Sequence, residues 1–381
     1  MHVLVDDVQK SILVHYASAY APLWRMANKI WSVQQRHHAV VVTTDQSNGY
    51  PPITAPALYI LAREGRAELF QWVRQMRPPE RPVSDVSERR LVEVAAKQGH
   101  EREVRQYVEK YLTHRIISHA SHVLGRIMTA AARGGHERLV RVCHEDYWHS
   151  PCVDDAMAAA AANGHESIVR LCHDAYGATY VNRAMEQAAR GGHERIVRLC
   201  RTEWKAVNIN QAMAKAARGG HEHIVRLCYD EWGARDVNKA FINAAKGGHE
   251  RIVRLCYEEW GARDVNEALS MAAKHNHEHI LHVCHDEWGA TDVDTAMQLA
   301  AFYGHERIVR QCRAWGATQV NCAMIEAAAA GEARIVQICY EEWGATVTAV
   351  EEAIFRANTL RNGHHIVQMC EEWLRGRKVS N

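Results

Sequence analysis

Histidine, glutamate and cysteine recur at fixed positions along this chain, and these side chains can ligate metals or take part in nucleophilic and acid–base catalysis. The histidine of a Gly-His-Glu triplet, which becomes Asn-His-Glu in one copy, returns every 28 residues, at His165, His193, His221, His249, His277 and His305. A cysteine follows each of these histidines by seven residues. Seven residues span about 10 Å of an α-helix, whereas zinc–ligand bonds are about 2 Å long. The two side chains of one copy therefore cannot share a zinc ion, and we expect no metal site.

The repetition itself argues against catalysis. A catalytic site needs one unusual constellation of side chains, whereas Cys, His and Glu return in nearly every copy. Gly-Gly pairs such as Gly191-Gly192 are not followed by Lys and Ser or Thr, so they do not match a phosphate-binding loop. We expect the chain not to be an enzyme, with no cofactor and no small-molecule substrate. Each repeated histidine is expected to lie in a tight turn and to bond nearby backbone.

Most of the cysteines share one position in the repeat. These nine are Cys143, Cys172, Cys200, Cys228, Cys256, Cys284, Cys312, Cys339 and Cys370. Because neighbouring copies should be one helix layer apart, the thiols lie beyond the roughly 7 Å Cα separation that a disulfide allows. We interpret them as small buried apolar residues of a reducing compartment. The alternative, a thiol-based redox or zinc protein, predicts fast thiol labelling in the native state.

Two helices separated by glycine must position these residues. The first helix opens at an Asn or Asp, which we expect to be the N-cap because its side-chain oxygen can accept a free backbone N–H. Ala and Met residues follow, and Gly-Gly ends the helix because Gly tolerates the left-handed conformation. The expected N-caps are Asp154, Asn182, Asn210, Asn238, Asn266, Asp294 and Asn321.

The second helix of each copy begins near the Glu of the triplet. Ile196, Val197 and Cys200 form one apolar helix face. Glu194 precedes Arg198 by four residues, the favourable order for an ion pair worth a few tenths of a kcal/mol. The pair returns in most of the regular copies.

The unit as a whole predicts an all-α solenoid. A pair of short helices cannot bury both of its faces, but stacked copies can. About eleven units fit between Pro52 and Trp373, and none contains a convincing strand. We therefore expect helical pairs stacked in sequence order, with the Ala/Met side of one unit packed against the Ile/Val/Cys/Trp side of its neighbours.

The repeated sequence Ala-Ala-x-Gly-Gly-His-Glu-x-Ile-Val-Arg-Leu, followed by Trp-Gly-Ala-x-x-Val-Asn, resembles an ankyrin repeat over residues 52–375. The unit has 28 residues instead of the usual 33, and Asn-x-Ala-Met replaces the usual Thr-Pro-Leu-His. The missing residues fall where ankyrin repeats carry their β-hairpin, so the resemblance implies an ankyrin-like solenoid with little or no hairpin. The near-identity of successive copies is similar to ankyrin-repeat proteins of large DNA viruses, most closely fish iridoviruses of the megalocytivirus type.

That resemblance implies a function. Viral ankyrin-repeat proteins of this kind bind host proteins and blunt immune signalling. The implied activity is a non-catalytic protein-interaction scaffold in the cytoplasm of an infected cell, which binds host signalling proteins and modulates innate immunity. Proteins of the NF-κB pathway are the targets that the resemblance suggests.

The repeat signature divides the chain into three parts. Residues 1–51 are expected to be an N-terminal helical cap plus an irregular loop, residues 52–375 the array, and residues 376–381 a short C-terminal tail. A separate recognition element is the alternative for the N-terminal helices, and the loop over residues 36–52 is a candidate partner contact because long loops are often functional.

Composition limits the classes of partner. The 46 basic and 45 acidic residues give a net charge of +1, so nothing demands nucleic acid or an acidic membrane surface. No apolar run approaches the length of a membrane span, and Met1-His2-Val3 is not the basic start of a signal peptide. We expect no membrane partner and a cytoplasmic location, with the nucleus as the open alternative.

Residues that differ between copies are the candidates for partner binding. Four successive copies carry Arg190, Arg218, Lys246 and Lys274 at one position, and the next copy continues with Phe302-Tyr303. One interpretation is cations that complement helix C-termini. The other is a basic stripe on the surface that is concave in ankyrin stacks, binding a protein or, as the alternative function, nucleic acid or another polyanion. Further exposed candidates are Lys215, Lys239, Asn243 and Gln298.

Overall fold

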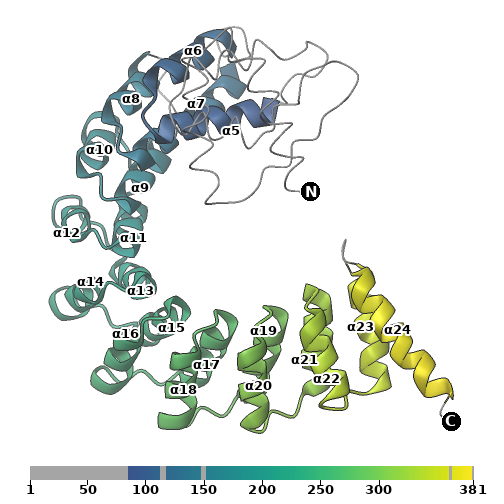
Figure 1. Cartoon of the computed structure of the whole chain (residues 1–381). Helices are drawn as coiled ribbons and strands as arrows, with labels where there is room; N and C mark the ends of the chain where they lie inside the picture. Colours follow the sequence, from purple (N-terminus) through teal and green to yellow (C-terminus); the bar gives the residue numbers. More distant parts are fainter. Residues whose placement is uncertain (1–84, 112–116, 147–151, 360–362, 380–381) are drawn as a thin grey trace, which may run out of the picture. The chain divides into compact units, whose positions relative to one another are not determined.

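The computed structural model describes residues 85–111, 117–146, 152–359 and 363–379, and these form helical pairs in sequence order (Figure 1). No strand occurs within those ranges. Ten helical pairs, α5 to α24, are present there. The all-α solenoid without β-hairpins is therefore confirmed for this part of the chain. The expected cap and loop of residues 1–51, and the first unit from Pro52 to Met76, lie outside the described residues.

Each unit contributes one first helix and one second helix. The first helices are α5 (Asp85–Lys97), α7 (Ile117–Gly134), α9 (Val153–Ala162), α11 (Val181–Gly191), α13 (Ile209–Gly219), α15 (Val237–Gly247), α17 (Val265–Lys274), α19 (Val293–Phe302), α21 (Val320–Ala330) and α23 (Val347–Asn358). The second helices are α6 (Glu101–Tyr111), α8 (Glu137–Arg141), α10 (Glu166–Arg170), α12 (Glu194–Thr202), α14 (Glu222–Arg226), α16 (Glu250–Arg254), α18 (Glu278–His282), α20 (Glu306–Ala314), α22 (Ala333–Glu341) and α24 (His364–Val379).

Five of the second helices continue into a short π-helical segment. These segments are η1 (Val142–Asp146), η2 (Leu171–Ala175), η3 (Leu227–Glu231), η4 (Leu255–Glu259) and η5 (Val283–Glu287). At the other end of the array, α24 continues to Val379, so most of the expected tail of residues 376–381 is the end of the last helix.

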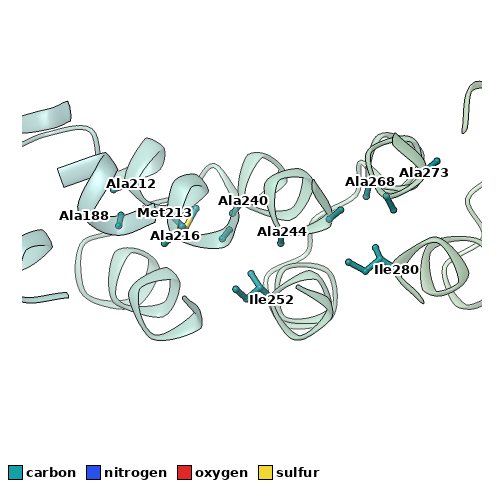
Figure 2. Packing of buried hydrophobic residues seen from close by; sticks show 14 of the residues in the cluster. Ala188, Ala212, Met213, Ala216, Ala240, Ala244, Ile252, Ala268, Ala273 and Ile280 are labelled. Carbon is teal, nitrogen blue, oxygen red and sulfur yellow. The ribbon is translucent and has the colours of Figure 1, made fainter. Parts of the chain in front are cut away.

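The core runs between successive units. Each first helix packs against its own second helix and against the first helices before and after it. Figure 2 shows alanines of neighbouring first helices facing one another, with Ile252 and Ile280 of the second helices beside them. Alanine permits this close approach because its side chain is a single methyl group. All nine repeated cysteines are buried in this core, as expected, and burial raises the pKa of the Cys200 thiol to about 12.

The Gly-Gly pair lies at the contact between units, where other units carry Asn163 or His275 in place of the first glycine. A Cβ on Gly219 would lie 2.3 Å from the carbonyl oxygen of Arg190 in the preceding unit, so only glycine fits there without a backbone shift. Gly220 has φ +82 and ends α13 as its C-cap, a conformation that L side chains rarely adopt. The expected role of glycine at the helix end is confirmed.

The expected N-caps are wrong by two positions. The first helix begins one residue before the Asn or Asp, so Asn210 is the second residue of α13 and Asn208 is its N-cap. Asn210 Oδ1 instead accepts the backbone N–H groups of Arg235 (2.8 Å) and Asp236 (3.0 Å), in the loop of the next unit. The equivalent side chains accept from the following loop in the same way: Asp154, Asn182, Asn238, Asn266, Asp294 and Asn321. This side chain therefore ties two units together.

The repeated histidine is a second tie between units. His249 Nε2 lies 3.1 Å from the carbonyl oxygen of Arg218, and it must carry the proton because a carbonyl oxygen only accepts. The expected bond to backbone is present, but its acceptor is 31 residues away in the preceding unit and not in the same turn. The same contact is made by His136, His165, His193, His221, His277 and His305.

Candidate partner-binding surface

The exposed side chains of the first helices lie in register on neighbouring helices, and we call this surface the first-helix face. In α11, for example, Ala184, Met185 and Ala188 are buried, whereas Arg183 and Arg190 are exposed. The same pattern returns along the array, because buried positions repeat while exposed positions differ. The first-helix face is therefore where one unit can differ chemically from the next without changing the stack.

A row of cations follows one edge of this face, and of its members Arg190 is exposed while the other three are half-buried. Arg190, Arg218, Lys246 and Lys274 lie in the last turns of α11, α13, α15 and α17. Their backbone carbonyls are the acceptors of the repeated histidines. We call these four residues the basic row. Among the described residues, none of the four side chains forms an ion pair with a carboxylate.

The charges of the row act on a common neighbour. The pKa of His275 is lowered, first by burial and then by the positive charges of Lys246, Arg218 and Lys274. One imidazole thus lies within the electrostatic reach of three of the four cations, those of α13, α15 and α17.

Sequence reasoning missed two further members of this edge. Lys97 of α5 and Arg133 of α7 occupy the same place, because their carbonyls accept from His136 and His165, and both side chains are exposed. These two cations cannot be found by counting residues forward from an expected N-cap, because their units are irregular. Counting three residues back from each histidine would have found both cations. Ala162 interrupts the sequence of charges between Arg133 and the basic row.

The basic row ends against an aromatic pair. Lys274 Nζ lies 5.1 Å from the centroid of the Tyr303 ring, and the rings of Phe302 and Tyr303 are 5.1 Å apart, edge to face. Both rings are more than one third exposed. Met271 and Leu299 are half-buried at equivalent positions of α17 and α19. We call Phe302, Tyr303, Met271 and Leu299 together the aromatic patch.

The remaining candidates differ in how free their side chains are. Lys215 is half-buried and Lys239 is exposed on the first-helix face. Asn243 Nδ2 donates to the carbonyl oxygen of Lys239 (2.8 Å), and Gln298 Nε2 donates to Gln319 Oε1 (2.8 Å). The two lysines are therefore the better candidates for contact with a partner, because the two amides already have partners within the chain.

A shallow hollow of about 590 Å³ lies on the same face over α5, α7, α9 and α11. Small residues such as Ala158 and Ala162 line its floor, and ion pairs line its walls: Arg126 Nε to Glu93 (2.7 Å) and Arg183 Nη1 to Asp155 (2.6 Å). Sequence reasoning did not identify this hollow. Two of its three arginines are paired with carboxylates, and Arg133 is the third.

The opposite side of the array carries paired arginines, and we call it the second-helix face. Arg198 bonds Glu194 of its own helix (2.7 Å) and Glu231 of the next unit (3.0 Å). This contact raises the pKa of Arg198 and lowers that of Glu231. The expected pair within one helix is thus one half of a bridge between units. Equivalent bridges join Arg170 to Glu166 and Glu203, Arg226 to Glu222 and Glu259, Arg254 to Glu250 and Glu287, and Arg310 to Glu306 and Glu342.

Stacked rings accompany these bridges. The residue after the repeated cysteine stacks on the Trp of the next unit, with ring centroids 4.0 Å apart for Tyr229 and Trp260 and 4.1 Å apart for Tyr257 and Trp288. The side chains of the second helices thus connect neighbouring units through both charge and aromatic contact.

Within the described ranges, no group of three His, Cys, Asp or Glu side chains is placed to hold a metal ion. No described helix is both long and apolar enough to cross a membrane. A scan of the sequence against protein-family models finds no match, and a search of curated proteins finds none either.

Proposed function

We propose that this chain is a non-catalytic scaffold that binds another protein through its first-helix face. The observation that carries the proposal is the basic row, whose four cations form no ion pair among the described residues. Arginines of the second-helix face, in contrast, are bonded to carboxylates of two units. Like charges in a row repel one another, so a surface that keeps them unpaired is suited to an oppositely charged partner.

The setting of this scaffold is proposed from the resemblance to viral ankyrin-repeat proteins. The partner would be a host signalling protein in the cytoplasm of an infected cell, and the consequence would be altered innate immune signalling. Proteins of the NF-κB pathway are the first candidates to examine.

Affinity capture from host cells, followed by mass spectrometry, tests this proposal. The test variant reverses the basic row (Arg190→Glu, Arg218→Glu, Lys246→Glu, Lys274→Glu). The control reverses four exposed arginines of the second helices: Arg102, Arg195, Arg251 and Arg307. We expect a small set of host proteins to be captured by the wild type and the control and lost from the test variant. Equal capture by all three proteins would contradict binding through the basic row.

The second candidate function is binding of nucleic acid or another polyanion through the same basic row. Its support is the same absence of ion pairs at these four described residues, and the near-zero net charge of the chain weighs against it. Polyanion binding should weaken steeply between 50 and 200 mM salt. An oligonucleotide titration at the two salt concentrations separates this function from protein binding.

A further inference from the structure

The basic row has a spacing that an extended peptide can match. Its four cations lie at one register position on four first helices, α11, α13, α15 and α17, each packed against the next. Packed helices are about 8–10 Å apart, and a peptide in the extended polyproline II conformation advances about 3.1 Å per residue with three residues per turn, so that every third side chain faces the same way. About three peptide residues therefore separate one cation from the next.

The two ends of the row differ. Beyond Arg190 the equivalent residue is Ala162, and beyond Lys274 it is Phe302 of the aromatic patch. Because Lys274 contacts the ring of Tyr303, a ligand that follows the row reaches an apolar surface about one helix further on. Single exposed apolar residues are common on proteins, but the Phe302 and Tyr303 rings contact each other and are both exposed at the end of a charged row, so they can anchor an apolar side chain.

We propose that the first-helix face binds an extended acidic segment of the partner protein, with an acidic residue at every third position and an apolar residue at one end. The carboxylates pair with the basic row, and the apolar side chain packs on the aromatic patch. This inference rests on the proposed function, because it names the chemistry of the partner at the same surface.

A peptide suits this surface better than a uniformly charged polymer does. Glu186 of α11 and Glu267 of α17 lie on the same face as the basic row, and they would repel phosphates that follow one another without a gap. A segment with neutral residues between its carboxylates can place those residues beside the two glutamates.

Fluorescence anisotropy with the full chain at physiological salt tests the proposal. One peptide has Glu at positions 1, 4, 7 and 10 and Leu at position 13, and a second has the reverse order. The control peptide has the same composition with its four Glu residues consecutive. We expect one of the two periodic peptides to bind at least 10-fold more tightly than the control peptide, because only its carboxylates match the helix spacing.

Variants of the protein locate the binding site. Arg218→Glu with Lys246→Glu should weaken binding of the periodic peptide at least 10-fold. Arg102→Glu with Arg195→Glu makes an equal charge change on exposed second-helix residues and should not weaken it. A periodic peptide with Ser in place of its terminal Leu should bind the wild type more weakly than the Leu peptide does. Phe302→Ala should remove this preference for Leu. Phe355→Ala, which truncates a 65% exposed ring elsewhere in the array, should retain that preference.

Three results would overturn the inference: equal affinity for periodic and control peptides, no binding of any peptide, or equal competition by an oligonucleotide of the same charge. The capture experiment separates these failures from failure of the proposed function. If the peptides fail while reversal of the basic row still abolishes host-protein capture, the scaffold function stands and the acidic-segment inference falls. If neither peptide binding nor host-protein capture depends on the basic row, the acidic-segment inference and the proposed function both fall.

Discussion

The arginine bridges of the second-helix face and the basic row of the first-helix face use the same kind of charged residue in opposite ways. On the second-helix face, Arg226 bonds Glu222 within its helix and Glu259 in the next unit. On the first-helix face, Arg218 and Lys246 have no carboxylate partner among the described residues, and only their backbone carbonyls are bonded, to His249 and His277. The arginine bridges of the second-helix face connect neighbouring units, and the basic row leaves its cations available.

This difference separates residues that hold the stack from residues that can recognise a partner. A cation in the last turn of a helix stabilises it by about 0.3–1 kcal/mol, which gives the basic row a modest structural role. That role does not explain why the neighbouring units have Ala162 and Phe302 at the same position. The proposed binding of a partner would account for both the row and its limits.

The largest effect on the stack should come from the glycine turn between the faces. Gly220→Ala places a Cβ 2.5 Å from the His249 ring at a φ of +82, so we expect strain of about 1–2 kcal/mol plus about 1–3 kcal/mol of overpacking. Gly233→Ala is the matched control, because φ is +72 and no atom lies within 4 Å of the added Cβ. Chemical denaturation measures both, and equal losses would show that the histidine contact is unimportant.

The asparagine tie should have the next largest effect. Asn210→Ala leaves the N–H groups of Arg235 and Asp236 without their acceptor, and we expect a loss of about 1–2 kcal/mol in unfolding free energy. Asn210→Asp should retain most of the stability, because Asp154 and Asp294 make the same contact in other units. An aspartate variant as unstable as the alanine variant would contradict this role.

Acid should weaken the histidine tie. Burial is the main cause that lowers the pKa of His221 and His277 below the ordinary 6.5, with His193, His223 and His249 adding repulsion around His221. As the pH falls, the unfolded chain therefore binds protons before the folded chain does. Stability that is present above pH 6.5 is lost as the pH falls through that value. Thermal unfolding at pH 7.5 and pH 5.5 measures the loss, and His221→Gln should reduce it. Equal or greater stability at pH 5.5 would show that these histidines are not held neutral by the fold.

The smallest effect should come from one bridge of the second-helix face. The side chains of Arg226 and Glu259 are 40% and 56% exposed, so water and salt screen their attraction. A double-mutant cycle should give a coupling of about 0.2–1 kcal/mol that decreases at 1 M salt. A coupling of several kcal/mol would mean that a single surface bridge, and not the turns, holds neighbouring units.

The sequence was sufficient to predict contacts within one unit, but it was insufficient to predict contacts between units. The 28-residue period predicted the helical pairs, the glycine ends and the buried Cys200, because helix geometry relates residues three and four apart. It assigned Asn210 to the wrong contact and found only half of the Arg198 bridge. Those partners lie 25 to 33 residues away, and the register of one unit on the next depends on packing that the repeat pattern does not contain. For the same reason, the sequence could not predict that the basic row forms no ion pair among the described residues.

The most direct test of the division between the two faces compares two charge-reversed proteins for thermal stability and for capture of host partners. Arg218→Glu with Lys246→Glu changes the first-helix face, and Arg198→Glu with Arg226→Glu changes the second-helix face. We predict that the first protein melts only slightly lower, because it loses two helix-end charges worth about 0.3–1 kcal/mol each, and that it loses capture, whereas the second melts several degrees lower and keeps capture below its transition. A first protein that unfolds early, or that captures partners as well as the wild type, would contradict the assignment of binding to the first-helix face.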